Sequence, residues 1–159
     1  FFDTPSPETI ASTQTPDQAH ATWLRMARMV SDAGFNFNFA PVVDLRGDPA
    51  EPGGAAVSPV IGKLGRAFSS DPAVIVRYAT RFIQAHHEAG VLTALKHWPG
   101  HGLALGDTHL GLVDVTNTAQ AVEQLPFQTL MHAGLADAVM TAHIVNRAID
   151  PLWPVTLSD

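Results

Sequence analysis

Residues 91–112 read VLTALKHWPGHGLALGDTHLGL, an apolar run that passes into a loop rich in glycine and histidine. The first seven residues, VLTALKH, have the pattern of a buried strand. Lys96 and His97 stand at its carboxyl end, and the loop that follows holds Asp107 and His109 two positions apart. Polar side chains where a strand ends are typical of the functional sites of α/β sheets and barrels.

The rest of the chain alternates predicted helices with predicted strands. Strands that alternate with helices imply a parallel sheet, so the fold class is α/β, either an open sheet or part of a TIM-type (β/α)8 barrel. Three strands are too few to close an eight-stranded barrel. The predicted helices cover residues 17–33, 69–90 and 116–135, the strands 35–45, 91–97 and 137–144, and the loops 1–16 and 46–69, with Asp17 and either Ser70 or Asp71 as helix N-caps.

Composition excludes several classes of protein. The chain has 159 residues, 46% hydrophobic residues, 15% charged residues, a net charge of −6 and two lysines, which disfavours binding to nucleic acid. Its apolar runs are shorter than the ~20 residues that cross a bilayer, so we expect no membrane contact. It has no cysteine, and hence no disulfide or thiolate ligand. It starts at Phe1 rather than Met, and we expect a piece of a longer protein.

The motif loop allows three interpretations. His97, His101 and His109 offer imidazoles to a metal, but Pro99 and Gly100 exclude helical ligand spacing, so no metal site is predicted. His101 is expected to fix the loop through hydrogen bonds. Asp107 and His109 suit proton transfer, because a carboxylate that holds one imidazole nitrogen raises the basicity of the other. The four histidines on predicted helices are expected at the surface or at the edge of the core: His20, His86, His87 and His132.

KHWPGHG, four further residues and DTHLGL together resemble the signature of glycoside hydrolase family 3. Three other stretches resemble motifs of that family in the same order: FNFNFAPVVDL at 35–45, GRAFSSDP at 65–72 and AVMTAHIVNRAIDPLWPVTLS at 138–158. The D-x-H pair is similar to that of the β-N-acetylhexosaminidase branch. The resemblance implies one domain over residues 1–159, an incomplete central part of a catalytic (β/α)8 barrel.

The resemblance also implies an activity and a set of site residues. The activity is the retaining hydrolysis of terminal β-linked N-acetylglucosamine, on peptidoglycan fragments or chitooligosaccharides, without a cofactor. The implied partner is this carbohydrate, and the implied compartment is the cytoplasm, with secreted or lipid-anchored forms left open. The implied roles are acid/base for His109, orientation of His109 for Asp107, hydrogen bonds to sugar hydroxyls for Lys96 and His97, a clamp on the sugar for Arg66, shaping of the site for Asp44 and the edge of the site for His143.

One departure from the family pattern, together with several alternative interpretations, leaves the function open. The family's nucleophilic aspartate follows the Thr-Leu-Ser element at some distance, whereas this sequence stops at PVTLSD, so we expect the nucleophile beyond Asp159 and no hydrolysis by residues 1–159 alone. Arg66 and Asp44 form a structural ion pair in the simplest non-functional interpretation. Three further hypotheses for the function are an incomplete sugar-binding domain, a metal-dependent hydrolase and a phosphorylase, since a neutral histidine repels phosphate less than a carboxylate does. The sequence indicates no oligomeric state.

Overall fold

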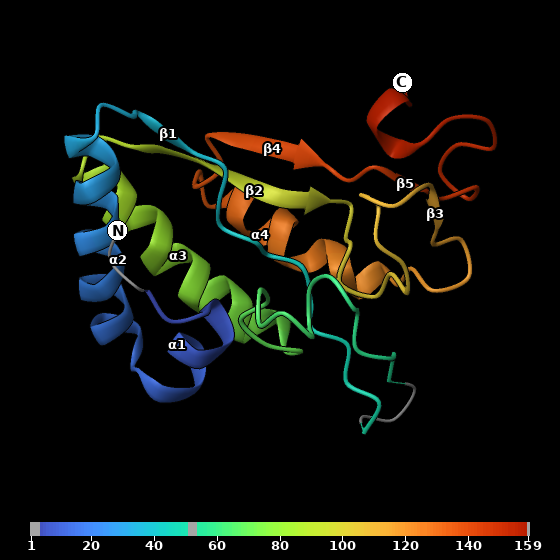
Figure 1. The fold of residues 1–159 in the computed structure, drawn as a ribbon, viewed down its shortest axis with the longest axis horizontal. Helices are drawn as coiled ribbons and strands as arrows, with labels where there is room; N and C mark the ends of the chain where they lie inside the picture. The colour runs from blue at the N-terminus through green and yellow to red at the C-terminus, as the bar shows by residue number, and fades with distance from the viewer. Residues whose placement is uncertain (1–3, 51–53, 159) are drawn as a thin grey trace.

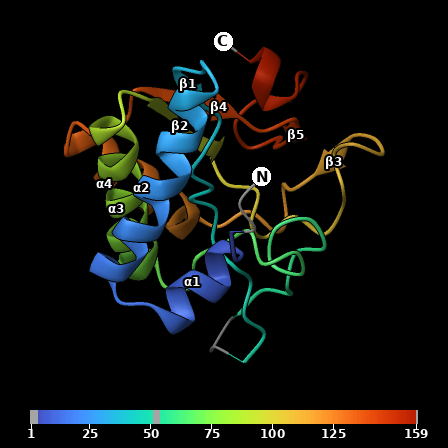
Figure 2. The same cartoon turned by 60° about the vertical axis from the view of Figure 1, so that its left-hand side comes forward.

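A computed structural model describes residues 4–50 and 54–158, which form a parallel sheet covered by helices on one face (Figure 1). The sheet has the strand order β1-β2-β4, and β2 pairs in parallel with both neighbours. Helices α3 and α4 lie against the sheet, and α2 packs on α3 (Figures 1 and 2). The main elements are α2 (Pro16–Asp32), β1 (Phe37–Asn38), α3 (Pro72–Glu88), β2 (Leu92–Trp98), α4 (Leu125–His132) and β4 (Ala138–Thr141).

Shorter elements complete the described chain. Helix α1 (Pro7–Thr13) precedes α2, and a 3₁₀ turn, η1 (Ala121–Gln124), leads into α4. Strands β3 (Val113–Asp114) and β5 (Ile144–Val145) pair in parallel beyond the carboxyl ends of the main strands, followed by a 3₁₀ turn, η2 (Val155–Leu157). None of the helices in the described part is long and apolar enough to cross a membrane.

The core lies between the sheet and helices α2 and α3. Trp23 of α2 is its centre, with ring centroids 5.7 Å from Phe68 and 5.6 Å from Phe82, both in edge-to-face geometry. Such aromatic pairs add about 0.5–1.5 kcal/mol each beyond the apolar area that they bury. The Tyr78 hydroxyl donates to the Gln14 carbonyl at 2.6 Å, so α3 also holds the turn between α1 and α2. This packing fixes the helical side of the sheet.

The helix over 69–90 is confirmed as α3, with Asp71 as its N-cap and Gly90 directly after its C-cap. The loop prediction over residues 1–16 is wrong for residues 7–13, because the Ser6 side chain accepts from Thr9 N–H and caps α1. Residues 1–3 of that stretch lie outside the described residues. Asp17 is not the N-cap of α2. Thr15 takes that position in a reciprocal capping box with Gln18.

The first predicted strand is shorter than expected. Residues 37–43 run beside β2, yet the regular strand β1 ends at Asn38 and pairing resumes only at a bridge from Val42 to Lys96. Pro41 lies between them and has no N–H to donate to a ladder, while its carbonyl still accepts from Lys96 N–H at 3.2 Å. The segment nevertheless leads to Asp44 at the end of the sheet where β2 also ends.

Three further expectations need correction. The helix predicted over 116–135 starts only at η1, so residues 116–120 are not helical. The strand predicted over 137–144 divides into β4 and β5. His86 is fully buried rather than at the surface: its Nδ1 bonds the Phe82 carbonyl at 2.8 Å and its Nε2 lies 3.0 Å from the Asn38 amide nitrogen. In its described part, the 46–69 segment contains no helix or strand, as predicted.

Candidate active site

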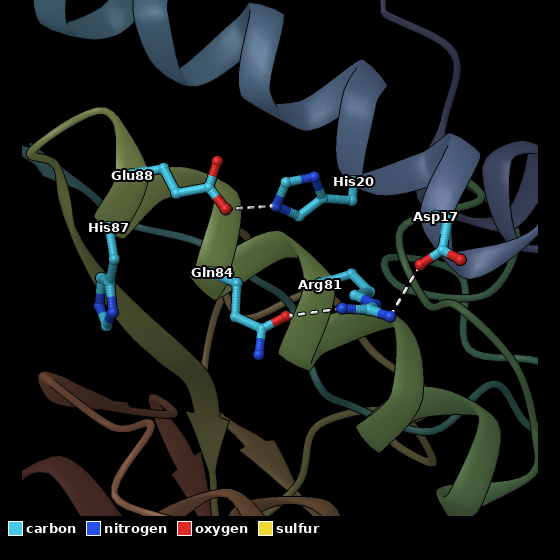
Figure 3. A pocket seen from close by; sticks show the side chains of 6 residues that line it. All are labelled: Asp17, His20, Arg81, Gln84, His87 and Glu88. Carbon is cyan, nitrogen blue, oxygen red and sulfur yellow. Dashed lines mark hydrogen bonds and ion pairs between the residues drawn. The ribbon is translucent and has the colours of Figure 1, made fainter.

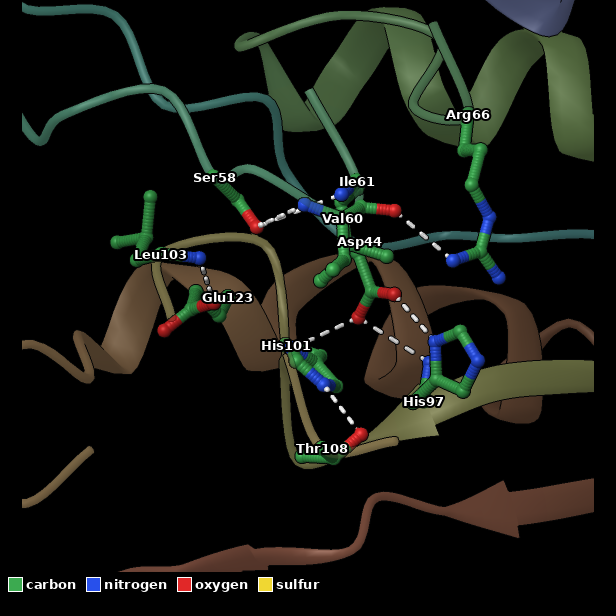
Figure 4. A network of polar contacts seen from close by, with 10 residues as sticks. All are labelled: Asp44, Ser58, Val60, Ile61, Arg66, His97, His101, Leu103, Thr108 and Glu123. Carbon is green, nitrogen blue, oxygen red and sulfur yellow. Dashed lines mark hydrogen bonds and ion pairs between the residues drawn. The ribbon is translucent and has the colours of Figure 1, made fainter. Parts of the chain in front are cut away.

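Asp44 organises the carboxyl end of the sheet (Figure 4). It has no exposed surface, and its Oδ2 accepts from His97 Nδ1 at 2.7 Å. Its Oδ1 accepts from the backbone N–H groups of His97 at 3.1 Å and His101 at 2.9 Å. Because Asp44 accepts a hydrogen bond from the Nδ1–H group of His97, the other ring nitrogen of that residue is left for the adjoining cavity.

The glycines of the motif let the loop approach this carboxylate closely. A Cβ at Gly102 would overlap the backbone of Leu45, and a Cβ at Gly100 would overlap the side chain of Glu123. Gly100 also has a φ of +136°, a conformation that other residues rarely adopt. The P-G-H-G order therefore places His101 between two positions that have no room for a side chain.

Asp107 and His109 form a contact within the motif loop. Asp107 Oδ1 accepts from His109 Nδ1 at 2.7 Å and from His109 N–H at 2.8 Å. These two hydrogen bonds lower the pKa of the Asp107 carboxyl. The imidazole is 81% exposed, in contrast to the 16% of the His97 side chain. The pair is thus formed and open to solvent, and its Nδ1 contact leaves Nε2 of His109 for a ligand.

A cavity of about 250 Å³ brings most of the predicted site residues together. Asp44 and Asp107 are absent from its lining and lie behind His97 and beside His109, respectively. Among the described residues that line it, none is an aspartate or a glutamate. The lining residues are Val60, Arg66, Lys96, His97, His101, Thr108, His109, Met140, Thr141, Ala142 and His143.

Arg66 and His143 both line this cavity and are held by contacts with different parts of the chain. Arg66 Nη1 donates to the Val60 carbonyl at 2.9 Å, which fixes the guanidinium from the long loop (Figure 4). The interpretation of Arg66 and Asp44 as a structural ion pair is wrong, because Asp44 bonds His97 and His101 instead. His143 is the second residue after the end of β4, and its Nδ1 lies 2.8 Å from the Thr156 hydroxyl.

Burial and positive charge shape the electrostatics of the cavity. Burial lowers the pKa of Lys96, and the nearby Arg66 guanidinium lowers it further, while Asp44 opposes both. Burial is also the main cause that lowers the pKa of His101. Two cationic side chains and several imidazoles therefore face a small space, which suits a ligand that offers many hydrogen-bond acceptors.

Sequence reasoning missed two residues beside this site. Glu123 of η1 is buried, and it accepts from Leu103 N–H at 3.2 Å and Gln120 N–H at 3.1 Å. Burial raises its pKa to about 7. Thr108 lies between the two residues of the D-x-H pair, with its hydroxyl 3.3 Å from His101 Nε2. The sequence signal for Glu123 was a glutamate inside the largely apolar stretch AVEQLPF. Thr108 had no such signal.

Another cavity, of about 480 Å³, lies elsewhere, in an open hollow between α2 and α3 (Figure 3). Two ion pairs lie among its lining residues, Arg81 with Asp17 at 2.7 Å and His20 with Glu88 at 3.0 Å. These ion pairs join two helices, far from the motif loop. Within residues 4–50 and 54–158, no group of three His, Cys, Asp or Glu side chains is placed to hold a metal ion.

Comparisons with known proteins agree on one family. The family model described as the glycosyl hydrolase family 3 N terminal domain matches residues 3–159. A beta-hexosaminidase of Xylella fastidiosa strain M12 is 44% identical over 133 residues, which cover 81% of this chain and 36% of that protein. A beta-hexosaminidase of Stenotrophomonas maltophilia strain K279a is 41% identical over 141 residues, covering 84% of this chain and 37% of that protein. The chain therefore spans little more than a third of these relatives.

Solved structures show the same fold. A beta-N-acetylhexosaminidase from Beutenbergia cavernae superposes with a TM-score of 0.83 and 30% identity, over 97% of this chain and 45% of that one. A family 3 glycosyl hydrolase from Mycobacterium smegmatis gives a TM-score of 0.80 and 36% identity over 97% of this chain and 46% of that one. The parallel strands and covering helices are thus part of a TIM-type barrel, as predicted. From this agreement of motifs, fold and relatives, the chain belongs to glycosyl hydrolase family 3 and matches its N-terminal domain.

Proposed function

We propose that the protein hydrolyses terminal β-linked N-acetylglucosamine with retention of configuration, on peptidoglycan fragments or chitooligosaccharides. One observation carries the proposal: His109, held by Asp107, lines the same 250 Å³ cavity as Arg66, Lys96 and His97. A proton-transfer group and several groups able to bind hydroxyls therefore meet in one cavity. The relatives named as hexosaminidases support the substrate class.

The Asp107–His109 pair supplies the acid and the base of this reaction. Asp107 accepts a hydrogen bond from the Nδ1–H group of His109, so Nε2 of His109 is the nitrogen that exchanges a proton with substrate. Because the pKa of Asp107 is lowered by these same hydrogen bonds, its carboxylate stays ionised and stabilises the imidazolium. His109 donates the proton on its Nε2 to the glycosidic oxygen in the first step. It takes one from the attacking water in the second.

The remaining residues bind the sugar. Lys96 and Arg66 offer only donors, and they direct these to the oxygens of sugar hydroxyls. A neutral His97 with its proton on Nδ1 donates that N–H to Asp44, so its Nε2 accepts a hydrogen bond from a sugar hydroxyl. A sugar hydroxyl both donates and accepts, and this mixture of groups satisfies both capacities. Lys96 and His97 are consecutive residues of β2, so the end of one strand positions both of these sugar-binding groups.

We also propose that the nucleophile lies beyond residue 159 and that residues 1–159 are the central part of one catalytic barrel. A retaining glycosidase that forms a covalent glycosyl-enzyme typically uses a carboxylate as its nucleophile. No described residue that lines the cavity carries a carboxylate. The sequence match to the Thr-Leu-Ser element argues against Asp159, which lies outside the described residues.

His109→Ala in the whole protein tests the proposed acid/base role. We expect kcat/KM on N,N′-diacetylchitobiose to fall by about 10²–10⁴-fold, because its alcohol leaving group needs a proton. On the 2,4-dinitrophenyl glycoside, which leaves without a proton, kcat/KM should change little, and azide should raise kcat and form the β-glycosyl azide. His132→Ala, on the exposed surface of α4, is the matched control. Equal losses on both substrates would contradict the role.

Phosphorolysis is a second candidate, favoured by one observation. The described cavity lining holds Arg66 and Lys96 and no carboxylate, so a phosphate dianion meets no repelling charge from these residues. A turnover rate that rises with inorganic phosphate, with N-acetylglucosamine 1-phosphate as product, would identify a phosphorylase. A rate independent of phosphate with free sugar as product would identify a hydrolase. Sugar binding without turnover by the wild-type protein would leave only a binding domain.

A further inference from the structure

The candidate site consists of a buried floor and an exposed arm. The floor is the Asp44-centred group, in which His97 and His101 bond a carboxylate that has no exposed surface. The arm is the segment 105–112, which carries Asp107 and His109 out to where the imidazole is 81% exposed. Its position relative to the floor determines where the His109 imidazole lies with respect to a bound sugar.

One side-chain contact joins the two parts. Thr108 Oγ1 lies 3.3 Å from His101 Nε2 (Figure 4). Of the hydrogen bonds among the described residues, this one alone ties segment 105–112 to another part of the chain; the others in the segment are internal to it, from Asp107 to His109 and Leu110. Leu103, two positions before the segment, is anchored separately, on Glu123.

His101 has the properties of a fixed anchor. It is 4% exposed, its N–H donates to Asp44, and its ring packs edge-on against His97 with centroids 5.7 Å apart. Its Nδ1 is buried and has no hydrogen-bond partner in the described chain. A neutral imidazole carries one N–H and one lone pair. With the proton on Nε2, the ring donates to Thr108 and leaves only a lone pair at Nδ1, which is the less costly group to bury unpaired.

We propose that His101 and Thr108 form a latch that positions the acid/base pair: His101, fixed on Asp44, holds the Thr108 hydroxyl and thereby sets the distance of His109 from the glycosidic oxygen. This inference rests on the proposed function, in which His109 transfers the proton. His101 and Thr108 are positioning residues rather than proton-transfer groups. A displacement of about 1 Å of a reacting group can lower a rate about 100-fold, so one weak contact is enough to matter.

Thr108→Val tests the latch in the whole protein, because valine keeps the shape and removes the hydroxyl. We expect kcat/KM on N,N′-diacetylchitobiose to fall by about 10- to 100-fold and that on the 2,4-dinitrophenyl glycoside by less than about threefold. Thr108→Ser, which retains the hydroxyl, should restore activity toward the wild-type value. Thr116→Val is the matched control, since the Thr116 hydroxyl bonds Asp114 at 2.6 Å and lies outside the cavity lining.

Amide hydrogen exchange gives a second readout that needs no turnover. Thr108→Val should speed exchange in peptides over 105–112, whereas Thr108→Ser and Thr116→Val should not. Unchanged exchange in Thr108→Val, or equal losses of kcat/KM on both substrates, would overturn the latch. If the wild type cleaves neither substrate, the proposed function fails, and the exchange experiment still decides whether the latch exists. If His109→Ala shows its leaving-group effect and Thr108→Val does not, the latch alone fails.

Discussion

Asp44 has no exposed surface, and each of its oxygens accepts hydrogen bonds from the motif loop. A buried carboxylate is costly unless such donors replace the water that it loses. Here the donors are two backbone amides and one imidazole, all from residues 97–101. Asp44 therefore acts from behind the cavity lining: it holds His97 in one tautomer and His101 in one position. Both the proposed sugar-binding nitrogen of His97 and the proposed latch depend on it.

Asp44→Asn tests this dependence. The substitution replaces one acceptor oxygen by an amide that donates, so at least one of the three contacts must be lost. We expect the free energy of unfolding to fall by about 2–3 kcal/mol, as for a hydrogen bond to a charged group. We also expect KM to rise, because His97 Nε2 no longer faces substrate as an acceptor. Urea unfolding and steady-state kinetics measure the two effects, with the exposed Asp32→Asn as control. Unchanged KM with reduced stability would restrict Asp44 to a structural role.

Single residues differ in how far sequence reveals them. The Asp107–His109 contact follows from a spacing of two on a glycine-flanked loop, and the contact is present at 2.7 Å. The burial of His86 on α3 had no such signal in the sequence. Its ring is held by Asn38 of strand β1 and by the Phe82 carbonyl of its own helix. Glu123 was missed for the same reason, because it accepts a hydrogen bond from the backbone of Leu103, which lies twenty positions away in the sequence.

At the scale of elements, helices with strong capping signals in the sequence were predicted correctly. Elements that depend on tertiary contacts were not. Helix α3 has an aspartate cap, a proline in its first turn and a glycine after its end, and its bounds were predictable. Helix α1 has a serine cap and a proline too, but it is only seven residues long and lies in a stretch rich in Pro, Ser and Thr. Its stability comes from burial of Ile10, which is a property of the packed fold.

Glu123 links η1 to the motif loop, and this link should depend on pH. Its pKa rises from the ordinary 4.5 to about 7, chiefly because it is buried, and the charge of Asp44 adds to the rise. The folded state therefore holds the proton more tightly than the unfolded state. The free energy of unfolding should fall as pH increases from 4.5 to 7, by about 3 kcal/mol in total from this group.

Glu123→Gln isolates that effect, because glutamine does not titrate. At pH 4.5 the variant should be less stable than the wild type by about 1–3 kcal/mol, since one of the amides of Leu103 and Gln120 loses its acceptor. The difference should narrow as the pH rises to about 8. Urea unfolding at a series of pH values measures it, with Glu88→Gln on the surface of α3 as the control. Parallel stability curves for wild type and Glu123→Gln would show that Glu123 does not titrate in this range.

At the scale of the whole molecule, the described sheet is incomplete for a barrel. It has three main strands, with helices on one face, and the outer strands β1 and β4 each pair on one side only among the described residues. Several large apolar side chains on or beside these strands are exposed: Phe35, Phe39, Leu92 and Val139. The α/β class was predictable from the alternation of elements, whereas barrel closure depends on strand number, which no pattern within these residues supplies.

The location of the nucleophile is the prediction that concerns the whole protein. A 5-fluoro N-acetylglucosaminyl fluoride forms a glycosyl-enzyme whose hydrolysis is slow, and its fluoride leaves without a proton. We expect one sugar per molecule of whole protein, attached to an aspartate outside residues 1–159, because the described cavity lining has no carboxylate. His109→Ala should still be labelled, and the separate 159-residue chain should not. Peptide mapping by mass spectrometry locates the sugar. A sugar found on Asp159, or on any carboxylate before it, would place both catalytic groups within residues 1–159 and contradict the proposal that the nucleophile lies beyond them.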